Sequence, residues 1–371
     1  MPYLIRLLRR FGFVGIDVHK LDRPEVPEMG GIGIVVGFLA GLLAVGLLIL
    51  MAERSVACQN QACTLPINFA SNVTLLNGKQ IGGFQLDLAS MFARVAEVGI
   101  VTILAGGIGL LDDLHPFKGW QKPVVTFVLP AVPFGLFAIL YYVPRIFLTN
   151  PQPKQISLLF TPYMDLPFYG TITLTVLFPL IALVAVTIGA NAANMMDVYN
   201  GVLPGTVEVV AISLLISALI LGRIEAIYLL LPFIGTLGAY YLFNRYPAKV
   251  FSGDVGSLAV GAAIVTIALV SRLEIVLLMA MIPFIVNGLN TLLSAGFRER
   301  REMKARPTYM TLDGKIAANP DPAAPVPLAN LFLLDGAKSE KEMIRMYIYT
   351  VAFSAILAIV TALIMHGGSL L

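Results

Sequence analysis

Carboxylate and amide side chains recur in short polar segments that separate apolar runs of the chain. They are Asp112 with Asp113, Asn191, Asn194 and Asp197 at three-residue intervals, and Asp254 within Gly253–Ser257. Carboxylate oxygens suit Mg²⁺, which usually takes one or two carboxylates together with phosphate oxygens. Lysine and arginine then neutralise the remaining phosphate charge. The residue types therefore predict a site that handles phosphate groups with a divalent cation.

Each segment also has a structural interpretation when it is taken alone. An Asp–Asp pair can be a solvated helix end, and asparagines on one helix face can form hydrogen bonds between membrane helices. Asp254 can be an N-cap. However, the glycines beside Asp254 also allow close backbone approach, and free N–H groups at a helix start can face a phosphate. Only the combination of segments favours a phosphate site.

The composition places these segments in a membrane protein. Of the 371 residues, 58% are hydrophobic and 13% are charged, and the mean hydropathy is +0.85. Soluble domains average about 45–50% apolar and about 25% charged residues. Two cysteines cannot form a disulfide scaffold, and the chain is too apolar to be disordered. A net charge of +3 provides no basic stripe, so no nucleic-acid partner is predicted.

Nine runs are apolar and long enough to cross a bilayer as helices, because a span needs about 20 residues. They are Gly31–Ala52, Leu88–Leu111, Pro123–Val143, Thr171–Gly189, Pro204–Leu221, Glu225–Phe243, Val255–Val270, Leu273–Ala295 and Arg345–Met365. None alternates as a barrel strand would. The predicted fold is an all-α polytopic membrane protein. Residues 1–371 form one integral membrane domain with a long loop at residues 296–344.

The topology of these runs gathers the polar segments on one side of the membrane. Loops on that side hold 17 Lys and Arg residues, against 6 on the other side. The positive-inside rule therefore predicts that this side is cytoplasmic. Because the helix positions follow from hydropathy alone, the convergence independently supports one cytoplasmic site. Residues 1–14 are predicted to form a basic interfacial or truncated helix, not a signal peptide.

In this order, the segments resemble the motifs of polyprenyl-phosphate N-acetylhexosamine-1-phosphate transferases. That family includes bacterial lipid I synthase and the eukaryotic dolichyl-phosphate GlcNAc-1-phosphotransferase. Pro27–Gly31 is similar to its first cytoplasmic motif, and Asp112-Asp113 to its aspartate pair. Asn191–Gly201 is similar to its Asn-x-x-Asn helix end, and Gly253–Ser257 to its metal-binding motif. The resemblance covers nearly the whole chain.

Within this family, two features make the sequence most similar to the archaeal and eukaryotic branch. Asp17–Lys20 resembles a segment of that branch, and the last cytoplasmic loop has no histidine, unlike the bacterial His-x-His-His motif. Family members have ten membrane helices, the first of which precedes this segment. The resemblance therefore implies a bundle of nine to ten transmembrane helices with cytoplasmic active-site loops. Either the sequence starts late or the first helix is reduced to Met1–Phe13.

The resemblance also implies roles for individual residues. Asp254 and Asn194 would bind Mg²⁺, with Mn²⁺ as an alternative. Asp112 or Asp113 would act on the lipid phosphate, and Lys122 would contact the diphosphate. Asn200 would bind uracil, and Glu28 and the segment 301–306 would hold the amino sugar and the diphosphate. The implied substrate-binding residues are Glu28, Lys20, Asn191, Asp197, Asn200, Gly253, Arg301, Lys304 and Arg306.

The implied reaction starts the synthesis of a lipid-linked glycan. GlcNAc 1-phosphate, or another N-acetylhexosamine 1-phosphate, passes from a UDP-sugar to a polyprenyl or dolichyl phosphate in the bilayer, and UMP leaves. Direct attack of the lipid phosphate is favoured over an aspartyl-phosphate intermediate. Related enzymes are often dimeric, so a homodimer stays open as an alternative.

Two rival functions have weaker support. An ion-coupled secondary transporter usually has repeated halves and charges at the bilayer midplane, whereas the polar residues here cluster at one interface. The exceptions are Arg94 and Glu97, which are interpreted as a structural ion pair although intramembrane charge can mark a functional site. A CDP-alcohol phosphotransferase is disfavoured because its Asp-Gly-x2-Ala-Arg motif is absent.

Overall fold

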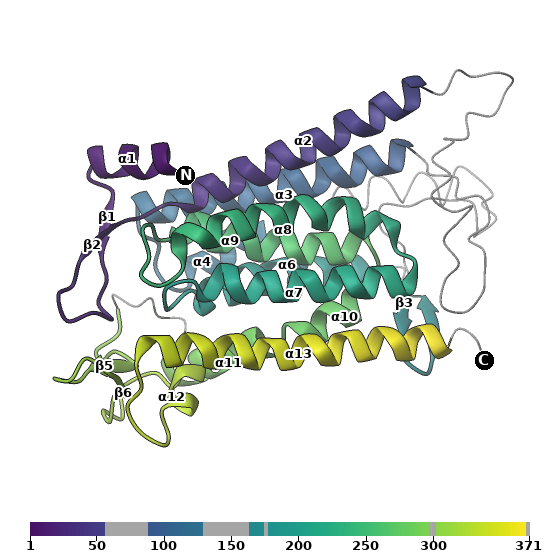
Figure 1. The fold of residues 1–371 in the computed structure, drawn as a ribbon. Coiled ribbons are helices and arrows are strands. Elements are labelled where there is room, and N and C mark those ends of the chain that lie inside the picture. The colour runs from purple at the N-terminus through teal and green to yellow at the C-terminus, as the bar shows by residue number, and fades with distance from the viewer. Residues whose placement is uncertain (56–87, 129–162, 174–176, 297, 299–301, 369–371) are drawn as a thin grey trace, which may run out of the picture.

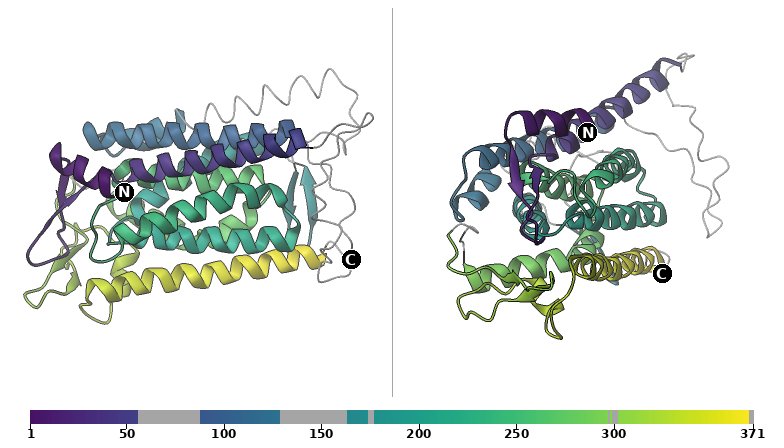
Figure 2. Two further views of the ribbon diagram at one scale, coloured as in Figure 1. Left: turned by 45° about the horizontal axis from the view of Figure 1, so that its top comes forward. Right: turned by 60° about the vertical axis from the view of Figure 1, so that its left-hand side comes forward.

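The structure is a computed structural model that describes residues 1–371 except 56–87, 129–162, 174–176, 297, 299–301 and 369–371. Long helices run side by side, and α13 lies along one edge of the bundle (Figures 1 and 2). Strands pair as hairpins at the bundle ends: β1 (Val14–Ile16) with β2 (Glu25–Pro27), β3 (Tyr163–Leu166) with β4 (Gly170–Thr173), and β5 (Thr308–Met310) with β6 (Ile316–Ala318). The end that holds β1 and β2 is termed the motif end, and the end that holds β3 and β4 is termed the opposite end.

The bundle consists of helices that are apolar over most of their length. They are α2 (Gly31–Ser55), α3 (Leu88–Leu114), α6 (Leu177–Met196), α7 (Val202–Leu221), α8 (Ile224–Asn244), α9 (Gly253–Val270) and α13 (Glu340–Gly368). Among the described residues, six helices are long and apolar enough to cross a membrane, or up to seven if one bent pair counts as a span. The protein is thus a mostly helical polytopic membrane protein. The predicted total of nine to ten spans is not confirmed.

Three of the predicted runs differ from the observed helices. Leu273–Ala295 divides into α10 (Glu274–Ala280) and α11 (Ile282–Ala295), which are bent by 63°. Pro283 lies at the start of α11. Proline is tolerated in the first turn of a helix, but it disrupts a continuous helix because it has no backbone N–H to donate. The predicted start at Thr171 is wrong because this residue lies in β4. Of Pro123–Val143, only its start lies in α4 (Gln121–Thr126), and the part beyond residue 128 is outside the described residues.

α9 occupies the centre of the bundle, with α2, α3, α6 and α8 packed against it. Of this helix, 89% is buried inside the protein. Glycine permits the close contact: a Cβ at Gly109 of α3 would overlap the main chain of Asp254, and one at Gly261 would overlap the carbonyl oxygen of Gly189. The first turn of α9 is therefore fixed directly against the last turns of α3.

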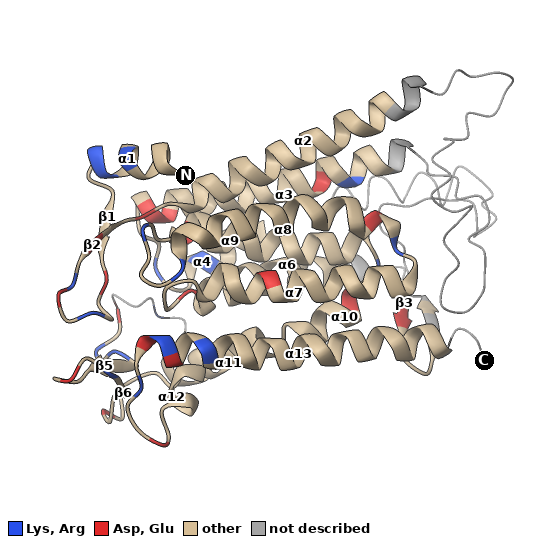
Figure 3. Cartoon of the chain, viewed as in Figure 1, with Lys and Arg blue, Asp and Glu red and all other residues tan. Residues whose placement is uncertain are grey.

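Charged residues concentrate at the motif end (Figure 3). The helix predicted within residues 1–14 is observed as α1 (Pro2–Arg10), which ends in two arginines. The long loop after α11 contains β5, β6 and α12 (Leu328–Phe332), and main-chain hydrogen bonds between Ile316 and Lys338 tie it to the segment before α13. The motif end therefore brings the N-terminal segment and the long loop before α13 to the same end of the bundle.

Candidate active site

A buried lysine joins two aspartates that are far apart in the sequence. The Lys122 Nζ atom of α4 lies 2.7 Å from Oδ2 of Asp112 and 2.9 Å from Oδ2 of Asp254. The side chains of Asp112 and Lys122 are 3% and 7% exposed, whereas that of Asp254 is 26% exposed. One cation thus serves two carboxylates, and Asp254 is the member of the cluster that solvent or a ligand reaches most easily.

The adjacent aspartates of α3 have separate environments. Successive residues of a helix point about 100° apart, so Asp112 faces Lys122 while Asp113 faces the start of α9. The Asp113 carboxylate accepts hydrogen bonds from the main-chain N–H groups of Asp254, at 2.9 Å, and Val255, at 3.1 Å. Gly253 has a φ of +68°, and a Cβ there would lie 2.6 Å from Asp113 Oδ2. Asp113 therefore caps α9 from another helix and positions Asp254.

Asn194 and Asn191 lie one turn apart on α6 but have different partners. The Asn194 Nδ2 atom donates to Asp254 Oδ1 and, at 2.8 Å, to Ser257 Oγ. The Asn191 Nδ2 atom instead donates to Thr126 Oγ1 at 2.8 Å and to the Thr187 carbonyl at 2.9 Å. The structure thus brings Asn194 into the aspartate cluster, whereas the Asn191 amide nitrogen links α6 to α4.

Asp197 follows the last turn of α6 and adds a further carboxyl group near the cluster. Burial first, and then the neighbouring Asp254 and Asp113 carboxylates, raise its pKa to about 7. A hydrogen bond with the Ser252 side chain opposes this shift. The crowding of carboxyl groups around a single lysine makes the motif end electrostatically favourable for an additional cation.

The segment Pro27–Gly31 is joined to the start of α9 by main-chain hydrogen bonds. The Phe251 N–H donates to Pro27 O, and the N–H groups of Gly30 and Gly31 donate to Phe251 O and Ser252 O, each at 2.8 Å. Neither Gly31 nor Gly256 has room for a side chain against the other. Glu28 is exposed, and its carboxylate lies against Gly15. Two of the sequence motifs thus form one rigid unit beside Asp254.

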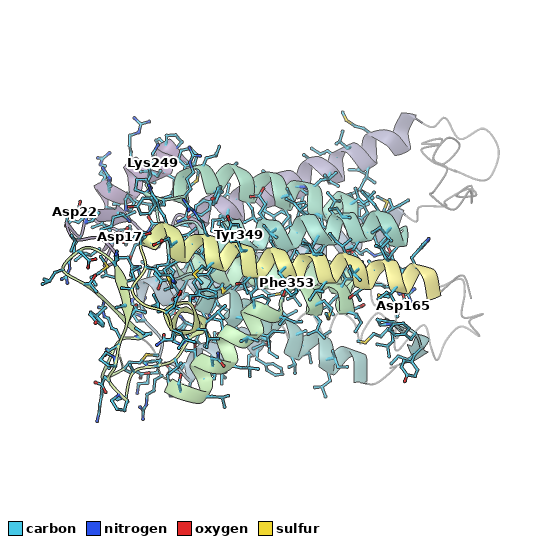
Figure 4. The ribbon with its side chains drawn as sticks, turned by 60° about the horizontal axis from the view of Figure 1, so that its bottom comes forward. Asp17, Asp22, Asp165, Lys249, Tyr349 and Phe353 are labelled. Carbon is cyan, nitrogen blue, oxygen red and sulfur yellow. The ribbon has the colours of Figure 1, made fainter. Side chains whose placement is uncertain are left out.

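A second polar cluster surrounds Asn200, the residue predicted to bind uracil. Its side chain contacts Asp17 and Lys20 of the first loop, and its main-chain N–H donates to Glu340 Oε1 at 3.2 Å. Asp17, Asn200 and Glu340 are all buried. Figure 4 shows Asp17 at the motif end, well separated from Asp165 at the opposite end.

Comparison with known proteins identifies the family. Residues 95–272 match the profile of glycosyl transferase family 4. The chain is 32% identical to a Methanocaldococcus jannaschii protein named "putative glycosyltransferase" over 57% of this chain and 68% of that protein. The chain belongs to glycosyl transferase family 4. It is therefore a transferase enzyme of the glycosyl-1-phosphate class, as the sequence motifs predicted.

Two further relatives of the family 4 enzyme carry more specific names. A Saccharolobus solfataricus protein named "putative UDP-N-acetylglucosamine–dolichyl-phosphate N-acetylglucosaminephosphotransferase" is 25% identical over 77% of this chain and 71% of its own length. A Bacillus licheniformis phospho-N-acetylmuramoyl-pentapeptide-transferase is 30% identical over 52% of this chain and 57% of its own length. Asp112, Lys122, Asn194 and Asp254 all lie within the residues that match the family profile.

The oxygen atoms around Asp254 fit a hard divalent cation. Among the described residues, no group of three or more His, Cys, Asp and Glu side chains could hold a metal ion. Mg²⁺ needs only one or two protein carboxylates, however, when phosphate oxygens complete its coordination. Asp254 is partly exposed, two carboxylates share one lysine, and no described residue donates to Asn194 Oδ1. The donor set of the family 4 enzyme therefore suits Mg²⁺.

The long loop contributes less to the described site than the sequence predicted. Lys304 and Arg306 are exposed, and no described contact joins their side chains to the aspartate cluster. Arg301 lies outside the described residues. The loop does approach the site through Glu302, which accepts a hydrogen bond from the Gly119 N–H at 3.3 Å, three residues before Lys122. The roles predicted for the three basic residues of this loop stay predictions.

Two polar residues of the motif end had no predicted role. Asp17 lies in a segment that carries the family resemblance, but the presence of an aspartate at this position does not predict which residue it contacts. Glu340 lies in the predicted loop 296–344, whereas the structure makes it the first residue of α13, where an acidic residue is typical because it stabilises the positive end of the helix dipole. An acidic residue shortly before a predicted membrane span was the available signal in the sequence, and it carried no specific role until the structure placed Glu340 beside Asn200.

Proposed function

We propose that the enzyme transfers GlcNAc 1-phosphate from UDP-GlcNAc to a polyprenyl or dolichyl phosphate, in a reaction that depends on Mg²⁺ and releases UMP. The arrangement that carries this proposal is Lys122 between Asp112 and Asp254, with Asn194 on the other oxygen of Asp254. It offers a cation for phosphate charge and an oxygen site for a metal within one cluster. The name of the Saccharolobus solfataricus relative supports the same substrates.

In the proposed reaction, an oxygen of the lipid phosphate attacks the β-phosphorus of the UDP-sugar. A new P–O bond forms, the bond between the β-phosphorus and the bridging oxygen breaks, and UMP leaves with the electron pair. Lys122 stabilises the negative charge that builds on the diphosphate. Because a phosphate monoester has its second pKa near 6, the nucleophile is largely ionised at neutral pH. Asp112 therefore acts mainly by orienting Lys122 and the lipid phosphate, and secondarily as a base.

Asp254 and Asn194 are the residues that would hold Mg²⁺. Bound there, the ion supplies positive charge that offsets the diphosphate. The protein contributes a fixed geometry, because Asp113 caps the helix that begins at Asp254 and Gly253 allows that cap to approach closely. Preorganisation of this kind lowers the barrier without rearrangement during the reaction.

The two-step alternative through an aspartyl phosphate would require a carboxylate that is free to attack. Asp113 is poorly suited, since both of its oxygen atoms accept main-chain hydrogen bonds from α9. Asp112 is ion-paired with Lys122 and also accepts the Phe117 N–H at 2.6 Å. Direct attack by the lipid phosphate therefore requires less disruption of the site.

We place the motif end on the cytoplasmic side of the cell membrane. The support is the excess of Lys and Arg in the loops at this end. The nucleotide sugar then reaches the site from the cytoplasm, while the lipid phosphate reaches it from the bilayer. A protease-protection assay on a tag inserted at Asp313, an exposed residue in the long loop, tests this orientation.

Purified full-length protein in nanodiscs, supplied with MgCl₂, UDP-GlcNAc and polyprenyl phosphate, tests the proposed reaction. The expected result is stoichiometric release of UMP and formation of a lipid-linked diphospho-GlcNAc. EDTA should abolish both products, and added Mg²⁺ or Mn²⁺ should restore them. Hydrolysis of UDP-GlcNAc without a lipid product, or full activity in EDTA, would contradict the proposal. An Asp313→Asn variant is the matched control, because that carboxylate lies outside the site.

A further inference from the structure

The cluster around Asn200 constrains both ends of its side-chain amide. The Oδ1 atom accepts a hydrogen bond from the Ala248 N–H at 2.6 Å and one from Lys20 Nζ at 3.3 Å. The Nδ2 atom donates to Asp17 Oδ2 at 3.1 Å. Lys20 is in turn ion-paired with Asp17 and lies 3.3 Å from Glu340 Oε2. Every polar group of this cluster thus contacts at least one other.

The chemistry of these partners allows only one orientation of the amide. A main-chain N–H and a lysine ammonium can only donate, and an ionised carboxylate can only accept. If the Asn200 amide were rotated by 180°, its NH₂ group would face two donors and its oxygen would face the Asp17 carboxylate. Each of these contacts would leave a buried polar group unsatisfied, which is costly. The cluster therefore fixes which atom of the amide is which.

The fixed orientation limits the kind of hydrogen bond that the Asn200 side chain can form with a ligand. Both lone pairs of Oδ1 are used, whereas Nδ2 has two hydrogens and only one partner among the described residues. Asn200 can therefore offer a donor but not an acceptor. Uracil has a carbonyl oxygen at C4, whereas cytosine has an amino group there, which is a donor.

We propose that Asp17 and Glu340 are positioning residues that hold Asn200 as a hydrogen-bond donor and thereby select a uridine over a cytidine nucleotide. Asp17 acts directly, because it accepts from the Asn200 amide. Glu340 acts through two other groups: it accepts the Asn200 main-chain N–H at 3.2 Å and holds Lys20 toward Oδ1. Because Glu340 is the first residue of α13, it also couples the last helix to the nucleotide site. This inference rests on the proposed function and on the prediction, implied by the family resemblance, that Asn200 binds the base.

Competition between UDP-GlcNAc and CDP-GlcNAc tests this inference with Asp17→Asn and Glu340→Gln enzymes in nanodiscs. We expect the ratio of the two kcat/KM values, uridine over cytidine, to fall about tenfold for Asp17→Asn, the size of one lost hydrogen bond. Glu340→Gln should lower the ratio by about threefold, since two indirect contacts weaken but the direct acceptor stays. The KM for UDP-GlcNAc should rise in both variants, while kcat and the KM for polyprenyl phosphate stay unchanged.

Glu342→Gln is the matched control, because this exposed residue lies on the same helix and its carboxylate accepts hydrogen bonds from Ser339, away from Asn200. Its uridine preference should equal that of the wild type. Folded Asp17→Asn and Glu340→Gln enzymes that keep the full preference would overturn the inference, even if transfer itself is normal. A wild-type enzyme that forms no lipid product from any nucleotide sugar would instead refute the proposed function.

A binding measurement keeps the inference testable without turnover. UMP should raise the Tm of the wild-type protein more than CMP does, and this difference should shrink in both variants. Equal stabilisation of the wild type by UMP and CMP would overturn the inference. If Asp17→Asn does not fold, Glu340→Gln carries the test, and an unchanged difference in that variant overturns the role of Glu340.

Discussion

The two ends of the bundle each hold a three-residue ion cluster, but the charge ratios are opposite. At the motif end, one lysine lies between two aspartates. At the opposite end, Asp165 of β3 lies between Arg223 and Arg272, with N–O distances of 2.5 and 2.6 Å. The arginines come from the connections after α7 and α9, so the anion joins a hairpin to two helix ends. All three side chains of this second cluster are about one-fifth exposed.

The opposite charge ratios indicate different roles for the two clusters. The cluster at the motif end belongs to the candidate active site, whereas Asp165, Arg223 and Arg272 stabilise the fold and are termed the clamp. At the opposite end the arginines repel each other: burial and then the neighbouring Arg272 lower the pKa of Arg223, and Asp165, followed by Glu225 and Glu274, opposes that shift. Removing the central Asp165 would leave like charges facing each other. At the motif end the excess charge is negative, so removing one carboxylate relieves repulsion instead. We therefore expect loss of an aspartate to impair chemistry at one end and folding at the other.

The largest expected effect is that of Asp254→Asn. Transfer should fall at least about 10³-fold, because the variant loses both a metal ligand and one ion-pair partner of Lys122. The Tm of the purified protein should stay within about two degrees of the wild-type value, since the cluster keeps one carboxylate per lysine. UMP release and thermal unfolding in the same detergent measure the two quantities. Loss of folding together with loss of activity would contradict this prediction, because it would show that the cluster at the motif end also stabilises the fold.

Asp112→Asn and Asp113→Asn distinguish the roles of the two adjacent aspartates at the motif end. Asp112→Asn should lower kcat about 10²-fold with little change in Tm, because Asp112 orients Lys122. Asp113→Asn should lower both kcat and Tm, because an amide has only one acceptor for the two N–H groups at the start of α9. Identical losses of kcat at unchanged Tm in the two variants would show that the aspartates act as equivalents.

How much of this site could be predicted from the sequence depended on the kind of signal. Hydropathy placed the segments with Asp112, Asn194 and Asp254 on one side, because helix length and loop order determine which ends meet. It could not separate Asp112 from Asp113, since that difference comes from the rotation of one helix against α9. The bend at Met281 was missed because the run was judged by its length and hydropathy, although Pro283 within it was an available signal. Glu340 was missed because its partner is 140 residues away along the chain.

Asp165→Asn tests the clamp at the opposite end. Its expected effect is a loss of about 1–3 kcal/mol in the free energy of unfolding, because two partly buried arginines lose their shared anion. The kcat of the folded fraction should equal that of the wild type. Thermal unfolding in detergent gives the first quantity, and initial rates normalised to folded protein give the second. A drop in kcat at normal Tm would mean that the two ends are coupled and that a clamp is too simple a description.

The smallest expected effect is that of Asn191→Ala, and it decides where the boundary of the active site lies. The resemblance makes Asn191 a substrate-binding residue, whereas its amide nitrogen bonds to Thr126 and Thr187 between α4 and α6. We expect a loss of about 1 kcal/mol in stability and less than about a threefold change in either KM. Thr126→Val removes one of these two contacts together with the bonds of its hydroxyl to the Lys122 and Pro123 carbonyls, so its cost should be similar and the double variant should lose less than the sum of the two. A tenfold rise in KM that Thr126→Val does not reproduce would instead place Asn191 among the substrate-binding residues, so that the active site extends one turn deeper along α6 than Asn194.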